Sequence, residues 1–434
     1  MMKDRNSMRR WFVPNAPVAI VLLLAFLALL PFGGLYNIPL LLLCGLGLWC
    51  LGPRPREVLG DDGLRLLLVL FLCVWLPMAI AAVDAVDPVQ SWRKVLSFPV
   101  FFLAGAYVVR ATRHQIELRR LLLGVWAVCI IWSIDASWQF VHELNLFGFP
   151  YQGGRVPGIF HPDLKLGIVL ATVSPLVLEA TRQLAQRSVW FALALIPFFA
   201  AIVLSGSRSS WIVVFVVLAV YSWYLFRWAA EPKVRGRAVL RVAAVGALAC
   251  GVLAYTVPQA VGHMHELLVK RAGPVAHLLI GDSQRADGAI KARIAAWESA
   301  GRVFRAHWFN GVGPRGFRQV HADYAPASDP YVSRGKALNY PHMLVLEIAA
   351  ETGTVGLLGY LVAFVVLLRR LVDMGRAQRL PHGFPYWLAI VVVLFPLATH
   401  LAFYAHFMGA LIWWTIAISA AGLGAATRVG KAHA

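Results

Sequence analysis

The chain has 434 residues, of which 59% are hydrophobic and only 14% are charged, and its mean hydropathy is +0.68. An ordinary soluble domain carries about 25% charged residues, so this composition excludes a soluble globular enzyme, a disordered chain and a coiled coil. It indicates an all-α polytopic membrane protein. At roughly 20 residues per span, the length allows about a dozen transmembrane helices.

The net charge is +19, from 40 Lys and Arg against 21 Asp and Glu. In a soluble protein such a surplus points to nucleic acid. In a membrane protein the cytoplasmic loops collect Lys and Arg, and anionic lipid head groups attract them there. We therefore expect the lipid bilayer, and no nucleic acid, to be the partner of most of this charge.

Twelve apolar runs follow one another along the chain. The basic N-terminal stretch resembles a signal peptide, but no small-residue cleavage site follows it and a second apolar run comes at once, so we expect a first span there. The runs lie at 16–32, 36–52, 64–83, 95–110, 121–141, 164–181, 188–205, 208–227, 238–258, 342–368, 384–400 and 405–427.

Basic residues fall in alternate loops between these runs. Under the positive-inside rule, this alternation places both termini and the basic loops in the cytoplasm. The basic residues are Arg9 and Arg10; Arg54 and Arg56; Arg110, Arg113, Arg119 and Arg120; Arg182 and Arg187; Arg227, Lys233, Arg235 and Arg237; Arg369, Arg370, Arg376 and Arg379; Arg428 and Lys431.

The outer face has one connection much longer than the others. We therefore expect three parts: transmembrane helices over 1–258, an outer segment of 83 residues over 259–341, and transmembrane helices over 342–434. Within the segment, 285–309 has apolar residues at helical spacing, which predicts an amphipathic helix that covers other elements or lies on the membrane. These apolar residues are Ile290, Ile294, Trp297, Ala300 and Phe304.

The outer segment is itself basic. It carries eleven Lys and Arg against six Asp and Glu, a surplus of five positive charges on the side where the positive-inside rule predicts none. A long loop can escape that rule, so a solvated basic face is one interpretation. The other is an anionic ligand on the outer side, such as a phosphate-bearing lipid or glycan.

The stretch 341–356, PHMLVLEIAAETGTVG, opens the tenth run. It resembles the signature of the O-antigen ligase and polymerase superfamily, in which a His at the outer mouth of a late helix begins the pattern H-N-x-x-L-x-x-x-x-E-x-G-x-x-G. Met343 takes the place of the Asn in that pattern, although Asn339 lies close before it. The matching residues are His342, Leu346, Glu351, Gly353 and Gly356.

Two further stretches occur in an order similar to that of the superfamily. SGSRSSW at 205–211 lies at an outer turn between two spans, and NGVGP at 310–314 lies in the long outer segment, after Arg293. The resemblance covers roughly residues 150–365. It implies a GT-C-like glycosyltransferase of the bacterial inner membrane. On the periplasmic face, such an enzyme transfers a polysaccharide from undecaprenyl pyrophosphate to a lipid A–core sugar hydroxyl, without a cofactor.

His342 is the candidate catalytic residue. An imidazole has an unperturbed pKa of about 6.5, so it can take a proton from a sugar hydroxyl near neutral pH. Direct attack by that hydroxyl on the donor would invert the anomeric centre. The alternative is that His342 is a structural residue at the membrane interface. His161, His263 and His265 lie in less defined loops.

Arg208, Arg293 and Arg155 are the candidate ligands of the pyrophosphate. Arg208 lies where a Gly- and Ser-rich turn enters a helix, a place whose free N–H groups favour an anion. Arg293 is a candidate mainly through the resemblance, and Arg155 lies in the outer loop GGRVPGIFHP. The alternative for Arg208 is an arginine that snorkels to the interface.

Glu351, Gly353, Gly311 and Gly313 are expected to support the site. Glu351 would lie two to three turns inside the tenth span, where a buried carboxylate needs a partner, and packing against a basic residue is the interpretation we favour. Gly311 and Gly313 most simply make a turn.

No metal site is predicted. Asp84 and Asp87 lie in the first substantial outer loop, but two carboxylates do not fill the six-oxygen shell of a divalent cation, so we expect polar loop residues there. The five cysteines have neither zinc nor disulfide spacing. They are Cys44, Cys50, Cys73, Cys129 and Cys250.

Two other functions stay open at this point. An O-antigen polymerase or a protein-glycosylating ligase of the same superfamily would differ only in its acceptor. A transporter or lipid-linked glycan flippase belongs to another class and predicts charged residues at mid-membrane and repeated halves with broken helices. The sequence shows neither clearly, and the candidate residues gather at one outer rim.

Overall fold

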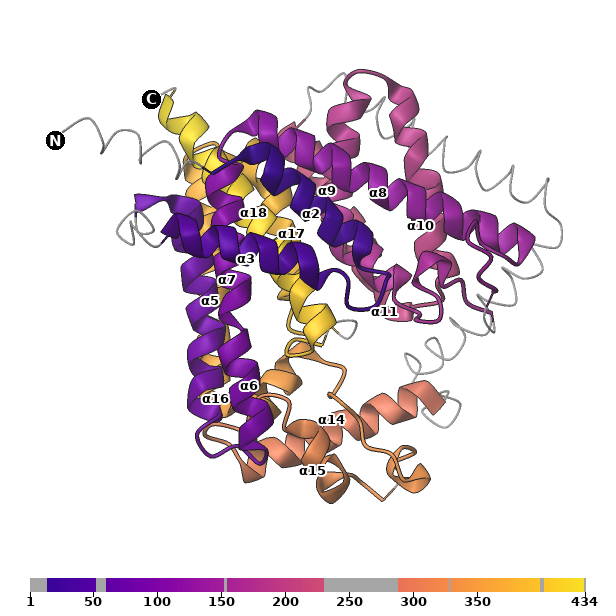
Figure 1. Cartoon of the computed structure of the whole chain (residues 1–434), viewed down its shortest axis with the longest axis vertical. Coiled ribbons are helices and arrows are strands. Elements are labelled where there is room, and N and C mark those ends of the chain that lie inside the picture. Colours follow the sequence, from indigo (N-terminus) through magenta and orange to yellow (C-terminus); the bar gives the residue numbers. More distant parts are fainter. Residues whose placement is uncertain are drawn as a thin grey trace. The chain divides into compact units, whose positions relative to one another are not determined.

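The computed structural model describes residues 14–51, 60–151, 154–229, 288–327, 329–398 and 402–432, most of which are helical (Figure 1). The ninth predicted span with Cys250, and the outer segment as far as residue 287, lie outside the described residues.

Seven helical stretches of the described chain are long and apolar enough to cross a membrane. The α6–α7 pair counts as one of them, because only Phe98 separates its two helices. They are α5 (Asp62–Ala81), α6 (Pro88–Ser97) with α7 (Pro99–Ala111), α8 (Gln115–His142), α9 (Leu166–Ala185), α11 (Arg208–Tyr224), α16 (Leu344–Arg376) and α18 (His406–Ala432).

Four shorter apolar stretches complete the set, and they are α2 (Ala16–Leu29), α3 (Asn37–Leu51), η2 (Val189–Ala194) with α10 (Leu195–Leu204), and α17 (Leu380–Val393). Eleven of the twelve predicted spans therefore coincide with helices of the described chain. The all-α polytopic fold is confirmed.

The chain forms two compact units that do not follow chain order. Unit 1 comprises 1–26, 37–118 and 287–434, and unit 2 comprises 27–36 and 119–286. The predicted division at 258 and 341 concerns membrane topology and stays a prediction.

Aromatic side chains form the centre of unit 1. The ring of Phe98 lies 5.2 Å from that of Phe101 and 5.6 Å from that of Trp413, centroid to centroid, which joins the α6–α7 junction to α18.

Asp61 joins the start of α5 to the end of α18. It accepts hydrogen bonds from two amides of the first turn of α5 and pairs with Arg428 of α18 at 2.6 Å. This cap fixes both helix ends at once.

The predicted amphipathic helix is present as α14 (Gly288–Ala306), but its buried face differs in part from the predicted one. Ala300 is buried as predicted, whereas Ile294 is 41% exposed. Small residues make up much of the buried face and let α14 lie close to its neighbours. With α15 (Phe317–Tyr324) and the start of α16 they form a small core of Ala296, Ala300, Val303, Val312, Phe317, Val320, Leu338 and Ala350.

Candidate active site

Helix α16 is broken at Gly353, whose backbone angles are φ 62° and ψ −156°. The break removes helical hydrogen bonds on both sides, and a second segment of unit 1 replaces them. Before the break, the carbonyls of Ala350 and Glu351 accept from the amides of Val312 and Gly313, both at 3.0 Å. The main chain thus remains hydrogen-bonded although the helix is interrupted.

The replacement continues beyond the break. The amide of Thr354 donates to the carbonyl of Trp308 at 2.8 Å, and that of Val355 donates to the carbonyl of Phe309 at 3.1 Å. We call the two segments 308–313 and 350–355, joined by these four bonds, the glycine lock.

The glycines of the lock allow the two main chains to touch. A Cβ on Gly353 would lie 2.4 Å from the carbonyl oxygen of Phe309, and one on Gly311 would lie 2.4 Å from the carbonyl carbon of Glu351. Both have positive φ, at 62° and 71°. Glycine is the residue that adopts this conformation without a steric cost. Gly311 therefore does more than make the turn that we expected.

Glu351 is fully buried at the lock, and its partner is main chain. Its Oε2 accepts from the backbone amide of Arg315 at 2.6 Å. We expected packing against a basic residue, but the contact with Arg315 is made by its main chain and not by its charged side chain. Glu347 lies one turn earlier and accepts from the amides of Phe403 and Tyr404 at 2.9 and 3.1 Å.

His342 lies two residues before α16, in the left-handed region of backbone space with φ 57°. For a residue other than glycine this conformation costs roughly 1–3 kcal/mol and is concentrated at functional sites. Its ring lies against that of Tyr340, with 4.3 Å between the centroids. Burial, together with the smaller effect of the charge of Arg293 on α14, lowers the pKa of His342 to about 4. Unit 1 therefore brings His342 and Arg293 together.

The first two backbone amides of α16 are already hydrogen-bonded within the protein, so they are not available to a ligand. The amides of Leu344 and Val345 donate to the carbonyls of Ala398 and Pro396, both at 3.1 Å. An anion near His342 would therefore be held by side chains of unit 1.

Unit 2 brings Arg155 and Arg208 to one turn. Arg155 Nε donates to the carbonyl of Ser205 at 2.9 Å, and the next amide, of Val156, donates to the carbonyl of Leu204 at 3.0 Å. Gly206 has φ 62°, and a Cβ there would lie 3.0 Å from Cγ of Arg155.

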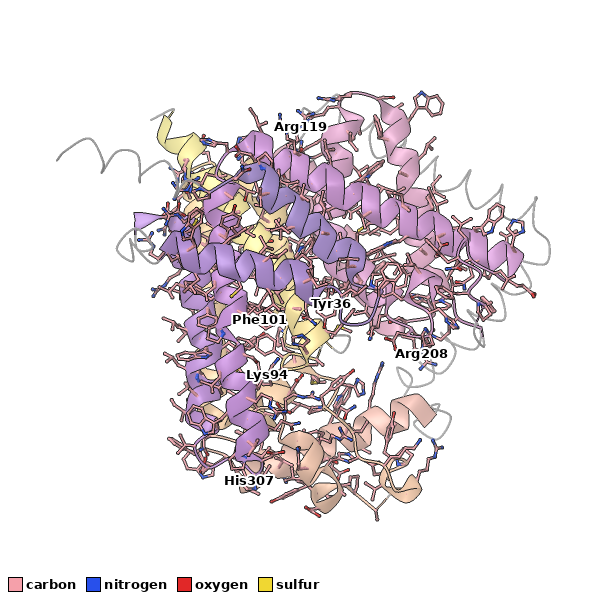
Figure 2. All side chains as sticks on the ribbon, viewed as in Figure 1. Tyr36, Lys94, Phe101, Arg119, Arg208 and His307 are labelled. Atoms are coloured by element: carbon pink, nitrogen blue, oxygen red, sulfur yellow. The ribbon has the colours of Figure 1, made fainter. Side chains whose placement is uncertain are left out.

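Arg208 follows as the first residue of α11 (Figure 2). Such a position lies at the positive end of the helix dipole, beside N–H groups that have no intrahelical acceptor. Such an arrangement suits an anion.

Asp84 and Asp87, which the sequence predicts in an outer loop, are engaged in protein contacts. Asp84 accepts from the Asn310 side chain at 2.5 Å, and Asp87 caps α6 through the amide of Gln90 at 3.0 Å. Within the described part of the chain, no three His, Cys, Asp or Glu residues are grouped as a metal site requires.

Sequence reasoning missed three further residues of unit 1. Tyr340 was not singled out, Arg315 counted only as one cation of the outer segment, and Lys94 lies one residue before a predicted span. The charges of Arg293 and Arg315 both act on Tyr340, although its own burial is the larger effect and raises the pKa of its phenol. Only the folded loop 312–315 brings Arg315 to this place.

These features define a multi-pass membrane protein whose helix ends carry one histidine and several arginines suited to an anionic substrate. Residues 192–361 match the family model described as O-Antigen ligase. No curated protein matches the chain in a sequence comparison. The match runs from η2 into α16 and includes Arg208, Arg293, His342 and the glycine lock, but not Arg155. This part of the chain is therefore similar to O-antigen ligases.

Proposed function

We propose that this protein is an O-antigen ligase of the bacterial inner membrane. It would transfer a polysaccharide from undecaprenyl pyrophosphate to a sugar hydroxyl of lipid A–core on the periplasmic face. The observation that carries the proposal is a half-buried histidine beside an arginine, at the entry to the broken helix of a region similar to O-antigen ligases.

His342 is the proposed general base. Its lowered pKa keeps the imidazole neutral at pH 7, so a ring nitrogen has a lone pair to accept the hydroxyl proton. An anion bound nearby stabilises the imidazolium form, which strengthens the base when the donor is present.

The proposed reaction is a direct displacement. The acceptor oxygen forms a bond to the anomeric carbon, its proton passes to His342, and the carbon–oxygen bond to the diphosphate breaks with its electron pair on the leaving oxygen. Attack opposite the leaving group inverts the anomeric centre, and no covalent glycosyl-enzyme forms.

Arg293 in unit 1, and Arg155 with Arg208 in unit 2, are the proposed partners of the diphosphate. A guanidinium presents a planar fork that matches phosphate oxygens in a bidentate manner. Glu351, Gly353, Gly311 and Gly313 would support the site through the glycine lock. We propose that no metal takes part, and the bonds already made by Asp84 and Asp87 support this.

The buried charges of unit 2 do not favour the transporter alternative. Asp135 of α8 accepts from the amide of Leu146 at 3.0 Å and from the side chain of Asn145 at 3.2 Å. Glu179 of α9 pairs with Arg182 at 2.6 Å and accepts from Tyr221 at 2.9 Å. Both carboxylates are therefore occupied by partners within unit 2.

The test is transfer by the purified protein in vesicles, with an undecaprenyl-pyrophosphate glycan as donor. Acceptors would be lipid A–core, a second donor molecule and an acceptor protein, each with and without excess chelator. We expect transfer to lipid A–core only, undiminished by chelator and with inverted anomeric configuration. Chain extension of the donor would identify a polymerase, transfer to protein a protein ligase, and flipping without transfer a transporter.

The periplasmic placement is tested by labelling single cysteines in a cysteine-free background. Ala337 and Ala377 are exposed positions on opposite sides of α16. We expect a membrane-impermeant reagent to label Ala337→Cys and not Ala377→Cys in intact spheroplasts. The reverse pattern would overturn the topology and the proposed function with it.

A further inference from the structure

The loop 312–315 of unit 1 lies along the start of α6. The amide of Val86 donates to the carbonyl of Val312 at 3.1 Å, and Ser91 Oγ donates to the carbonyl of Pro314 at 3.1 Å. Lys94 follows Ser91 by three residues and therefore lies on the same face of α6. The loop thus brings Arg315 to the face that carries Lys94.

Arg315 is fixed by its main chain while its guanidinium keeps donors available. Its amide is bonded to Glu351, and its φ is 69°. Its Nη1 is buried and has no hydrogen-bond partner. Within the described chain, no carboxylate forms an ion pair with the Arg315 guanidinium, for which an oxygen would have to lie within 4.0 Å.

Lys94 has aromatic neighbours in place of a carboxylate. Its Nζ lies 5.8 Å from the ring centroid of Phe98 and 5.9 Å from that of Phe101, and Figure 2 shows it on α6. The acidic groups whose charges act on Lys94 are Glu351 and Glu347. Both oxygens of Glu347 and Oε2 of Glu351 accept from backbone amides, whereas Oε1 of Glu351 has no hydrogen-bond partner. Neither carboxylate forms an ion pair with the ammonium group.

Two cations that share a partly buried face without an ion-pair partner are costly to keep, unless an anion joins them. Arg315 also acts on Tyr340, whose ring lies against His342. The charge of Arg315 therefore reaches a direct neighbour of the proposed base, and both cations are on the same unit as Arg293.

We propose that Lys94 and Arg315 form a phosphate-binding subsite of the active site. This inference rests on the proposed function, which supplies two phosphate-bearing substrates. The group bound would be either the diphosphate of the lipid-linked donor or a phosphate carried by the lipid acceptor. Lys94 acts as a point charge, and Arg315 supplies the bidentate fork.

The experiment uses the full-length protein in vesicles and four variants. Lys94→Gln and Arg315→Gln remove the charges of the subsite, and the matched controls Arg93→Gln and Arg318→Gln remove exposed charges from the neighbouring positions. Inorganic pyrophosphate and undecaprenyl pyrophosphate are tested as inhibitors of transfer and, by displacement of a fluorescent pyrophosphate analogue, as ligands. KM is measured separately for the glycan donor and for lipid A–core.

Losing a hydrogen bond to a charged group costs about 1.5–3 kcal/mol, which corresponds to roughly 10- to 150-fold in affinity. We expect a change of this size in either subsite variant and less than about threefold in the controls, the latter as for exposed charges. A rise in donor KM with weaker pyrophosphate binding assigns the subsite to the donor. A rise in the acceptor KM alone assigns the subsite to the acceptor. In that case the variant and the wild type should have the same KM for dephosphorylated lipid A–core.

Unchanged affinities for both substrates in a folded Lys94→Gln protein would overturn the subsite and leave the proposed function intact. Folding is checked by thermal unfolding, and Arg315→Lys, which keeps the charge but loses the fork, should recover only part of the loss. Conversely, pyrophosphate binding that depends on Lys94 in a protein without transfer would retain the subsite and overturn the proposed function.

Discussion

Units 1 and 2 each contain a glycine with positive φ within a motif of the candidate site, but the two glycines have different neighbours. A Cβ on Gly353 of unit 1 would meet a backbone carbonyl oxygen at 2.4 Å, whereas a Cβ on Gly206 of unit 2 would meet the side chain of Arg155 at 3.0 Å. Backbone held by hydrogen bonds does not move aside, but a flexible arginine stem does. Gly353 therefore determines whether the fold forms, and Gly206 determines where a guanidinium lies.

The largest effect is expected for Gly353→Ala. It combines about 1–3 kcal/mol of backbone strain with about 1–3 kcal/mol of overpacking, because the φ is positive and the lock leaves no room. We expect a sharply lowered unfolding temperature or no folded protein in detergent. Gly301→Ala is the control, since no atom lies within 4 Å of its Cβ and alanine within a helix stabilises by roughly 0.5–1 kcal/mol. Equal unfolding temperatures for the two variants would contradict the lock.

His342→Gln should lower the rate of transfer at saturating substrates by roughly 10²–10⁴-fold, the usual contribution of a positioned base. The unfolding temperature should change little, because the side chain is only partly buried. His307→Gln is the matched control: this histidine of unit 1 contacts Tyr324 at 3.2 Å and has no proposed role in transfer. Turnover near the wild-type value in His342→Gln would remove the general base from the mechanism.

Gly206→Ala should act on binding more than on folding. The added methyl group pushes against Arg155, so we expect a rise in donor KM of about tenfold, the loss of part of one charged hydrogen bond. Gly335→Ala is the control for backbone strain, because its φ is 65° and no atom lies within 4 Å of its Cβ. If both variants raise KM equally, the contact with Arg155 is irrelevant to donor binding.

The smallest effect is a shift in pH dependence. Protonation of His342 removes the lone pair that accepts the proton, so kcat/KM should fall as the pH drops through the pKa of about 4. Arg293→Gln removes a charge that lowers this pKa, so the residual activity should be lost at a higher pH, nearer to the ordinary value of about 6.5. Arg302→Gln, an exposed change on the same helix, should leave the acidic limb of the kcat/KM profile at the same pH. An unmoved limb in Arg293→Gln would show that their charges do not interact.

The helices were predictable because each is a continuous apolar run, long enough to be read without knowledge of its neighbours. The start of α6 was missed, although Asp87 and Pro88 form an N-terminal cap and first turn there. The apolar signal begins only near Val95, so the predicted span began too late to include Lys94. Lys94, a candidate phosphate ligand, was therefore missed.

A candidate site residue can be picked out where it lies inside its own motif, as for His342 and Glu351, whose roles stay predictions. It cannot be picked out where the contact joins distant parts of the chain. Ser91 and Pro314 are separated by 223 positions. Their hydrogen bond, with that of Val86 to Val312, brings Arg315 to the face of α6 that carries Lys94. Likewise, the partner of Glu351 is a backbone amide, and every non-proline residue has one, so residue type carries no signal for it.

The break in α16 also separates the helix mechanically. Beyond Gly353 the helix exposes Leu358, Leu361 and Leu368, at 57%, 57% and 47%, as expected of a surface that faces lipid tails. A span answers a thicker or thinner bilayer by tilting, and this part of α16 would tilt together with α5 and α17, which it contacts. The part that carries His342 is instead held by the four bonds of the lock. The geometry around the histidine is thus insulated from hydrophobic mismatch, and from changes in the acyl chains that surround the protein.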